Sequence, residues 1–129
     1  MFDMLNISWS GLSAQRFRLD VVAENLANIH STRTPQGHAY WRQVPIFQEA
    51  GGLRGVKVVG LATDPRPGPR EYQPGHPDAD GDGYVQLPNV DPTVEMVNML
   101  AAARAYQANV TAFEAGKSIF KAALEMGRS

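Results

Sequence analysis

Three aspartates alternate along the segment DADGDG at residues 78–83. The calcium loop of an EF-hand begins with the same pattern. It has carboxylates at loop positions 1, 3 and 5, a glycine at position 6 and an aliphatic residue at position 8, which is Val85 here. Hard cations such as Ca²⁺ prefer oxygen ligands, so convergent carboxylates could hold one. One hypothesis from this spacing is therefore a calcium site formed by Asp78, Asp80 and Asp82.

The same segment departs from an EF-hand loop at both ends. Position 12, which is a bidentate glutamate in an EF-hand, is Asn89 here, and Pro88 precedes it. Pro74 and Pro77 stand where a helix would have to lead into the loop. Aspartate and glycine are also ordinary turn residues, so the sequence favours a solvated turn, and no metal or other cofactor is expected.

No other set of residues has the spacing of a catalytic site. The histidines at positions 30, 38 and 76 match no metal-ligand pattern. The serines near the N-terminus lack the G-x-S-x-G turn of a nucleophile. The glutamates are scattered, which leaves no carboxylate pair for acid–base chemistry, and cysteine is absent. We therefore expect that this chain is not an enzyme.

Length and charge exclude several further classes. With 129 residues, 43% of them hydrophobic, the chain is one domain's worth of material with enough apolar side chains for a core. A formal net charge of −1 gives no field for steering towards nucleic acid or anionic lipid. No run of about 20 apolar residues could span a bilayer, and the N-terminus lacks the basic and apolar regions of a cleaved signal. We expect no nucleic-acid binding, no membrane insertion and, if the protein is exported, a route that reads another signal.

The elements that must position any functional residue are two long helices at the two ends of the chain. Asp91 as N-cap and Pro92 at the first helical position predict a helix that runs to about Gly127. Such a helix is roughly 50 Å long at about 1.5 Å per residue, so it must project from a compact body. Its predicted seam alternates steps of three and four, as in a coiled coil: Met96, Met99, Ala103, Tyr106, Val110, Phe113, Lys117, Phe120 and Leu124.

The N-terminal helix, predicted from Leu5 to about Ala27, has a similar seam. That seam comprises Leu5, Trp9, Leu12, Arg16, Leu19, Ala23, Leu26 and His30. Asn25 and Asn28 favour helix termination through a left-handed C-cap conformation, and hydrogen bonding at an interface is compatible with that interpretation. Thr34-Pro35 then blocks continuation of the helix.

An antiparallel pairing of the two helices is the expected arrangement. The expected register matches Leu5 with Leu124, Trp9 with Phe120, Leu19 with Val110, Ala23 with Tyr106 and Leu26 with Ala103. Arg16 would then lie near Glu114, and polar residues at seam positions commonly set register or partner choice. Burial of one seam within a single bundle remains the alternative. The alanines on another face of the C-terminal helix favour a multi-subunit tube instead.

The middle of the chain predicts a small β part. Residues 38–47 have the aromatic and branched side chains of a strand, and Pro45 demotes that strand to an edge or an extended arm. Residues 55–61 form a second strand candidate, residues 64–77 a stiff extended connector, and residues 84–87 a brief strand. The predicted fold is mainly α with a small β part, organised as residues 1–30 and 91–129 in one discontinuous helical domain around a middle segment, 31–90.

Several motifs resemble the axial proteins of the bacterial flagellar rod and hook. They are PGHPDADGDGYVQLPNVD at 74–91, running into EMVNM at 95–99, RAYQANV at 104–110, and AENLAN at 23–28 with the later Thr34, Gly37 and Tyr40. The resemblance covers almost the whole chain, and its first motif points to a proximal-rod member of that family. In this family the terminal helices pack as a coiled-coil inner tube, and the middle segment forms an outer layer.

The resemblance implies a structural subunit of the proximal rod, the drive shaft that transmits torque for motility. The implied partners are other copies of the chain, the rod proteins FlgB, FlgF and FlgG, the rod-base adaptor FliE and the flagellar type III export apparatus. The implied location is the basal body in the periplasmic space, reached without a cleaved signal. With the seams, the motifs give this expected assembly interface: Leu5, Trp9, Leu12, Arg16, Leu19, Asn25, Leu26, Asn28, Met96, Met99, Tyr106, Asn109, Val110, Phe113, Phe120 and Leu124.

A second hypothesis comes from a different class of protein. A calcium-responsive adaptor could bind partner helices with its long helices and use the loop from Asp78 to Asp82 as a gate. Calcium binding in the micromolar range would favour this adaptor over a structural subunit.

Overall fold

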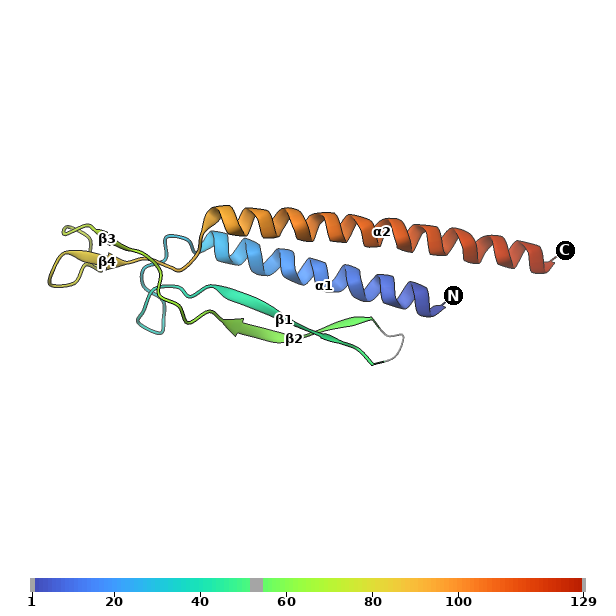
Figure 1. Cartoon of the computed structure of the whole chain (residues 1–129), viewed down its shortest axis with the longest axis horizontal. Helices are drawn as coiled ribbons and strands as arrows, with labels where there is room; N and C mark the ends of the chain where they lie inside the picture. Colours follow the sequence, from blue (N-terminus) through green and yellow to red (C-terminus); the bar gives the residue numbers. More distant parts are fainter. Residues whose placement is uncertain (1, 52–54, 129) are drawn as a thin grey trace. The chain divides into compact units, whose positions relative to one another are not determined.

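The computed structural model describes residues 2–51 and 55–128, with side chains from residue 5 onward. The elements follow the order α1 (Phe2–Ala27), β1 (Gln43–Glu49), β2 (Val56–Thr63), β3 (Arg70–Tyr72), β4 (Tyr84–Gln86) and α2 (Pro92–Arg128) (Figure 1). The strands form two separate two-stranded sheets, β1–β2 and β3–β4. The expectation of a mainly α chain with a small β part is confirmed.

The helix ends follow their local sequence in part. Asp91 caps α2, because its Oδ1 accepts a hydrogen bond from the Thr93 amide at 2.9 Å, as an N-cap residue should. α1 ends at Ala27, and the Asn28 side chain donates back to the Glu24 carbonyl at 2.9 Å. The expected left-handed asparagine cap is wrong, since no described residue other than glycine has a positive φ. Asn25 does not terminate the helix either, because it lies within α1.

The β part contains one strand more than the sequence suggested. β1 and β2 form the expected hairpin, and Pro45 lies inside β1. The segment expected to be only an extended connector contains β3, which pairs antiparallel with β4 so that Glu71 lies opposite Val85. A three-residue strand between prolines carries too little periodicity to be recognised from sequence. Its partner β4 buries Val85 completely.

The chain divides into two compact units. Unit 1 consists of Met1–Leu19, Pro45–Gly60 and Leu100–Ser129, and unit 2 consists of Asp20–Val44 and Leu61–Met99. In each unit a part of α1 lies beside a part of α2 that runs in the opposite direction (Figure 1). The coiled-coil packing expected for the two helices stays a prediction.

In unit 1 the buried side of α2 differs from the predicted seam. At two of the seam positions the buried residue is the one just before the predicted residue. Ala102 and Gly116 are buried, whereas the predicted seam residues Ala103 and Lys117 are exposed. The predicted positions Tyr106, Phe113 and Phe120 are half-buried. Small side chains at these positions let two helix backbones approach closely. The larger side chains before and after them fill the remaining space. The prediction that Lys117 fills a gap in the seam is therefore wrong.

The same displacement occurs on α1. Ser8 is buried, whereas Trp9 is 63% exposed and Arg16 is also exposed. The seam prediction holds at Leu12, which is buried, and at Leu19, which is half-buried. Periodicity of apolar residues favoured Trp9 because it is large and apolar, but a small residue one position earlier occupies the buried place.

The expected register of the two helices is wrong. In unit 1, Gly11 lies against Asn109, and in unit 2 the side chain of Asn25 donates a hydrogen bond to Glu95. The expected register would have placed Ser118 opposite Gly11 and Arg104 opposite Asn25. Each contact differs from it by about nine residues, or about two and a half helical turns. In unit 2, Val22 is buried, whereas the predicted seam residue Ala23 is exposed.

Gly11 gives a direct test of the register. A Cβ atom added at Gly11 would lie 2.6 Å from Asn109 Oδ1 and 2.9 Å from its Cγ. Gly11→Ala should therefore destabilise the chain by about 1 kcal/mol net, because an overpacking cost of about 1–3 kcal/mol exceeds the helix-propensity gain of about 1 kcal/mol. Gly11→Ala/Asn109→Ala should recover this loss in urea unfolding.

Gly127→Ala is the matched control for Gly11→Ala. A Cβ atom at Gly127, also in α2, would meet nothing within 4 Å. This variant should be as stable as the parent or slightly more stable. If Gly11→Ala matches Gly127→Ala, or if Asn109→Ala fails to rescue it, Gly11 does not face Asn109.

Candidate assembly site

A cluster of polar side chains lies in unit 2, where the end of α1 meets the start of α2. We call it the polar cluster and define it as Asn25, Tyr40, Arg42, Asn89 and Glu95. Asn25 is 1% exposed and Glu95 is fully buried, although asparagine and glutamate are rarely buried to this extent without partners. Their burial has to be compensated by hydrogen bonds, because an unpaired buried polar group costs about 1–3 kcal/mol.

Asn25 uses both ends of its side-chain amide. Its Nδ2 donates to the Gln43 carbonyl at 2.9 Å and to Glu95 Oε2 at 3.3 Å. Its Oδ1 accepts from the Tyr40 hydroxyl at 2.7 Å and from the Gln43 amide at 3.0 Å. One side chain on α1 thus holds the first residue of β1 through both of its backbone polar groups, and it also holds α2.

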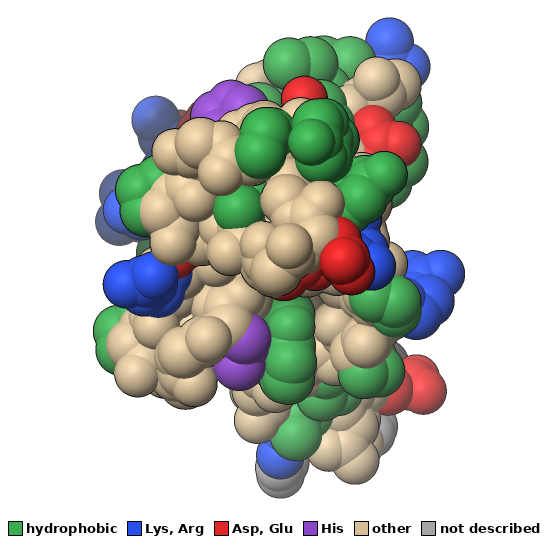
Figure 2. Space-filling model, turned by 90° about the vertical axis from the view of Figure 1, so that its left-hand side faces the viewer, with side chains coloured by type: hydrophobic (Ala, Val, Ile, Leu, Met, Phe, Trp, Pro, Cys, Tyr) green, Lys and Arg blue, Asp and Glu red, His purple; other side chains and the backbone are tan. Residues whose placement is uncertain are grey.

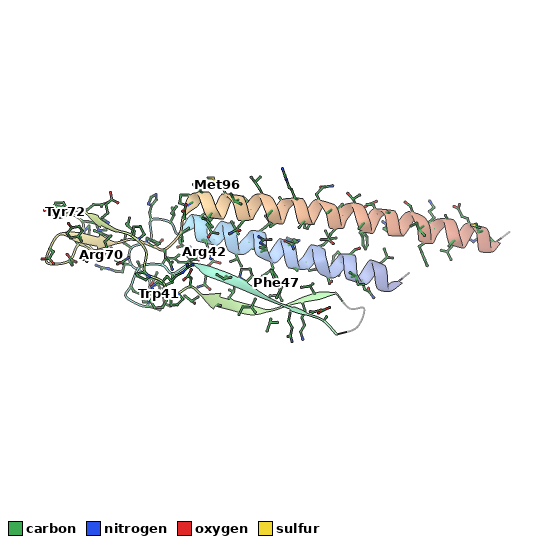
Figure 3. All side chains as sticks on the ribbon, viewed as in Figure 1. Trp41, Arg42, Phe47, Arg70, Tyr72 and Met96 are labelled. Carbon is green, nitrogen blue, oxygen red and sulfur yellow. The ribbon has the colours of Figure 1, made fainter. Side chains whose placement is uncertain are left out.

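Arg42 supplies the charge that balances Glu95. Its Nε donates to Glu95 Oε1 in an ion pair, and the guanidinium is largely shielded from solvent. The Arg42 amide donates to Asn89 Oδ1 at 2.6 Å, and Asn89 Nδ2 donates to the carbonyls of Asp64 and Arg66 at 2.9 and 2.7 Å. The polar cluster therefore ties four segments of unit 2 to each other. Figure 3 shows Arg42 where β1 begins, and Met96 on the side of α2 that points away from α1.

Burial also changes the acidity of Tyr40. The low-polarity surroundings raise the pKa of its phenol to about 12, and the negative charges of Glu24 and Glu95 contribute in the same direction. The unfolded chain loses this proton near the ordinary pKa of about 10. Because the folded pKa is the higher one, the contribution of Tyr40 to stability is fully present below pH 10 and is lost as the pH rises towards 12.

We therefore expect a Tyr40-dependent loss of stability in alkali. Urea unfolding of the wild-type chain should weaken between pH 10 and 12 by up to about 1.4 kcal/mol per pH unit from this residue. Tyr40→Phe should start less stable and show a shallower decline. Tyr72→Phe is the control, since Tyr72 is 62% exposed and should leave the slope unchanged. Equal slopes for wild type and Tyr40→Phe would contradict the assignment.

The aspartates of the predicted calcium loop are engaged by donors of the chain itself. Thr32 Oγ1 donates to Asp78 at 2.7 Å, and Arg33 forms an ion pair with the same carboxylate. Asp80 Oδ1 accepts from the amides of Asp82 and Tyr84, each at 2.9 Å, as in an Asx turn.

These contacts lower the pKa of Asp78, first through Thr32, and the pKa of Asp80, first through the Tyr84 amide. Among residues 2–51 and 55–128, no group of three or more His, Asp or Glu residues could hold a metal ion. The loop is therefore a turn between β3 and β4. Gly83 has a φ of 86°, and a Cβ atom at this position would lie 2.8 Å from the Tyr72 ring. No observation favours the calcium hypothesis.

The expected interface residues fall into three groups by exposure. Exposed residues are Trp9, Arg16, Met96 and Leu124. Half-buried residues are Leu5, Leu19, Leu26, Asn28, Met99, Tyr106, Asn109, Val110, Phe113 and Phe120. Leu12 and Asn25 are buried within the chain, so they support its fold and are not accessible to a partner.

The helices also expose apolar residues that the seam prediction missed. On α2, Val97, Leu100 and Ile119 are 59%, 64% and 54% exposed, and Met96 is 56% exposed. Figure 2 shows apolar and charged side chains interspersed over the face that it presents. Within the described part of the chain, no helix is long and apolar enough to cross a membrane. Exposed apolar side chains on a long helix are typical of a protein–protein contact surface.

Sequence reasoning missed most of the polar cluster. In the sequence, Glu95 and Tyr40 stand out only within the motifs of the flagellar resemblance, and Arg42 only within a strand-like segment. The available signal was Asn25 itself, because an asparagine inside an otherwise apolar helix pattern needs a buried partner. No pattern in the sequence indicates which residue that partner is.

Two family models of known proteins match the N-terminal and the C-terminal part of the chain. Residues 5–33 match the family described as "Flagella basal body rod protein", and residues 82–126 match the one described as "Flagellar basal body rod FlgEFG protein C-terminal". The chain is 42% identical to the flagellar basal-body rod protein FlgC of Yersinia enterocolitica, over 99% of this chain and 98% of the relative.

Two further relatives of the same name come from other bacteria. The chain is 39% identical to FlgC of Borreliella burgdorferi, over 96% of this chain and 95% of the relative. It is 40% identical to FlgC of Bacillus subtilis, over 98% of both chains. With identity at this level over nearly the full length of both partners, the chain belongs to the FlgC family of flagellar basal-body rod proteins.

Proposed function

We infer that this chain is a structural subunit of the rod of the bacterial flagellar basal body and serves motility. The observation that carries this inference is the identity of about 40% to rod proteins along almost the entire chain. The role is structural and not enzymatic, in keeping with relatives that are named as rod proteins. As a rod subunit, the chain occupies the proximal rod and helps to transmit torque.

Assembly uses the exposed faces of α1 and α2. Trp9, Met96 and Leu124 are contact candidates among the expected interface residues, since they are 63%, 56% and 52% exposed. Heterologous contacts that do not close build open helical filaments, as a rod requires. The half-buried seam residues shape this surface, and the polar cluster keeps the two helices in one register so that the surface is the same in every copy.

The terminal segments, 1–30 and 91–129, act as the helical part of the assembled subunit, and residues 31–90 form its outer part. The partners are other copies of this chain, FlgB, FlgF, FlgG and the adaptor FliE. The chain reaches the periplasmic space through the flagellar type III export apparatus. A net charge of −1 gives no strong long-range field to guide assembly, so in this proposal apolar contacts carry it.

Deletion of the gene in its native host tests the function. We expect loss of swimming and basal bodies without a complete rod in electron micrographs, both restored by the wild-type chain supplied in trans. Normal swimming with complete rods would overturn the proposed function. A Met96→Asp variant should restore motility poorly, whereas Glu125→Asp, which keeps the charge at an exposed position of the same helix, should restore it fully.

A further inference from the structure

The net charge of −1 is the sum of two opposite excesses of charge. Unit 1 contains eight Lys or Arg residues and four Asp or Glu residues, which gives it a net charge of +4. Unit 2 contains four Lys or Arg residues and nine Asp or Glu residues, which gives it a net charge of −5. Opposite charge on two surfaces favours contact between them. A second copy of this chain therefore offers each unit the charge that it lacks.

The acidic excess of unit 2 is not neutralised inside the unit. All four of its arginines form ion pairs within it, with Asp64, Asp78, Asp80 and Glu95. Five exposed acids then have no ion pair among the described residues: Asp20, Glu24, Glu71, Asp82 and Asp91. Asp20 and Glu24 are four residues apart on α1, so they lie on one face of the helix, about 6 Å apart along its axis.

The basic excess of unit 1 includes a pair with the same spacing. Lys117 and Lys121 are exposed on α2, and they line one recess of its surface together with Leu124, which is 52% exposed. Neither lysine forms an ion pair with a side chain that the structure describes. Glu114 also lines the recess, and Arg128, seven residues after Lys121, adds a third cation on the same side of the helix.

We propose that Lys117 and Lys121 of one copy of the chain pair with Asp20 and Glu24 of a neighbouring copy in the rod. The two pairs have opposite charge and equal spacing, so two ion pairs form together. Exposed ion pairs add little affinity, and they act here by selecting which surfaces meet. Burial of Leu124 beside them adds an apolar contribution. This proposal rests on the proposed function, because the rod is what holds neighbouring copies together.

A second copy fits these charges better than a polyanion does. A nucleic acid or an anionic membrane would match only the basic residues of unit 1. It would repel Asp20 and Glu24, which would stay without a partner. A second copy satisfies the lysines and the acids through the same contact. Because this contact joins two different surfaces, it can be repeated from one copy to the next.

Zero-length crosslinking of purified basal bodies tests the pairing. A carbodiimide joins a lysine amine to a carboxylate only where the two groups touch. We expect a product of twice the mass of the chain, in which mass spectrometry finds Lys117 or Lys121 joined to Asp20 or Glu24. Lys57, exposed in the same unit, is the internal control and should join neither acid. Links from Lys117 and Lys121 to a different rod protein, links within one chain only, or no link in basal bodies that contain the chain would overturn the proposal.

Charge reversal gives an independent test. Asp20→Lys/Glu24→Lys and Lys117→Glu/Lys121→Glu should each lower the amount of the chain in basal bodies by about tenfold, because two attractions become two repulsions. A chain with all four substitutions should regain the wild-type amount, since opposite charges face each other again. All four positions are exposed, so the purified variants should keep the helical circular dichroism of the wild type. If the fourfold variant stays as depleted as the double variants, the two pairs do not face each other.

Lys57→Glu/Glu71→Lys is the matched control for the double variants. It reverses one exposed charge in each unit away from the two pairs, and it should leave the amount of the chain unchanged. An equal loss in this control would show that the total charge of each unit matters and not the proposed pairing. If the wild-type chain itself is absent from purified basal bodies, the proposed function fails, which is a different result from a missing crosslink.

Discussion

Glu95→Ala is expected to lower the free energy of unfolding by about 3–5 kcal/mol, since it breaks a buried ion pair and leaves one charge without its partner. Glu95 is fully buried and accepts hydrogen bonds from Arg42 Nε and Asn25 Nδ2. Removing the carboxylate leaves the guanidinium of Arg42 in a shielded place with no anion beside it. Urea unfolding followed by circular dichroism measures the change.

Two further variants separate the ion pair from simple loss of volume. Glu125→Ala removes a carboxylate from an exposed position of the same helix and should change stability by less than about 0.5 kcal/mol. Glu95→Met/Arg42→Met replaces both charges by apolar side chains and should recover a large part of the loss, because both desolvation costs disappear together. If Glu95→Ala proves as mild as Glu125→Ala, the ion pair does not stabilise unit 2.

Asn25→Ala is the second large expected effect, with a loss of about 2–4 kcal/mol. The substitution removes four hydrogen bonds and leaves the Tyr40 hydroxyl and the Gln43 amide without an acceptor in a buried place, at about 1–3 kcal/mol for each group. Alanine is the better helix former, so any measured loss comes from the contacts and not from helix propensity. Thermal and urea unfolding of the purified chain measure this loss.

Asn6→Ala is the control for Asn25→Ala, because Asn6 is exposed on the same helix and its loss should be nearly neutral. Asn25→Asp adds a sharper test. A carboxylate at this position faces Glu95, and this like-charge contact raises the folded pKa of the new acid, so the variant should lose stability as the pH rises above about 4. A pH-independent Asn25→Asp variant would show that Asn25 does not contact Glu95.

The sequence predicted well those features that depend on neighbouring residues. The Asp91-Pro92 start of α2 and the β1–β2 hairpin follow from capping, proline and branched residues within a few positions of each other. Such signals are local, so no knowledge of the tertiary contacts is needed to read them.

The helix register could not be predicted in the same way. Apolar periodicity favours Trp9, Ala23 and Met96 as buried residues, but all three are exposed, and Ser8, Val22 and Glu95 are buried one position earlier. About half of the predicted seam residues are buried or half-buried in the structure as well. The expected register and the observed one therefore both satisfy the apolar pattern. What distinguishes them is the pairing of Asn25 with Glu95 across 70 positions of sequence, and hydrophobicity gives no weight to such a pair.

The composition of purified basal bodies tests the rod assignment most directly. Hook–basal bodies from the native host, stripped of loosely bound protein and quantified by mass spectrometry, should contain this chain in a fixed ratio to the other rod proteins. They should lose it, together with the more distal axial proteins, in a strain that cannot build the rod. Recovery of the chain only from soluble fractions, with basal bodies that are complete without it, would mean that this member of the FlgC family is not a rod subunit.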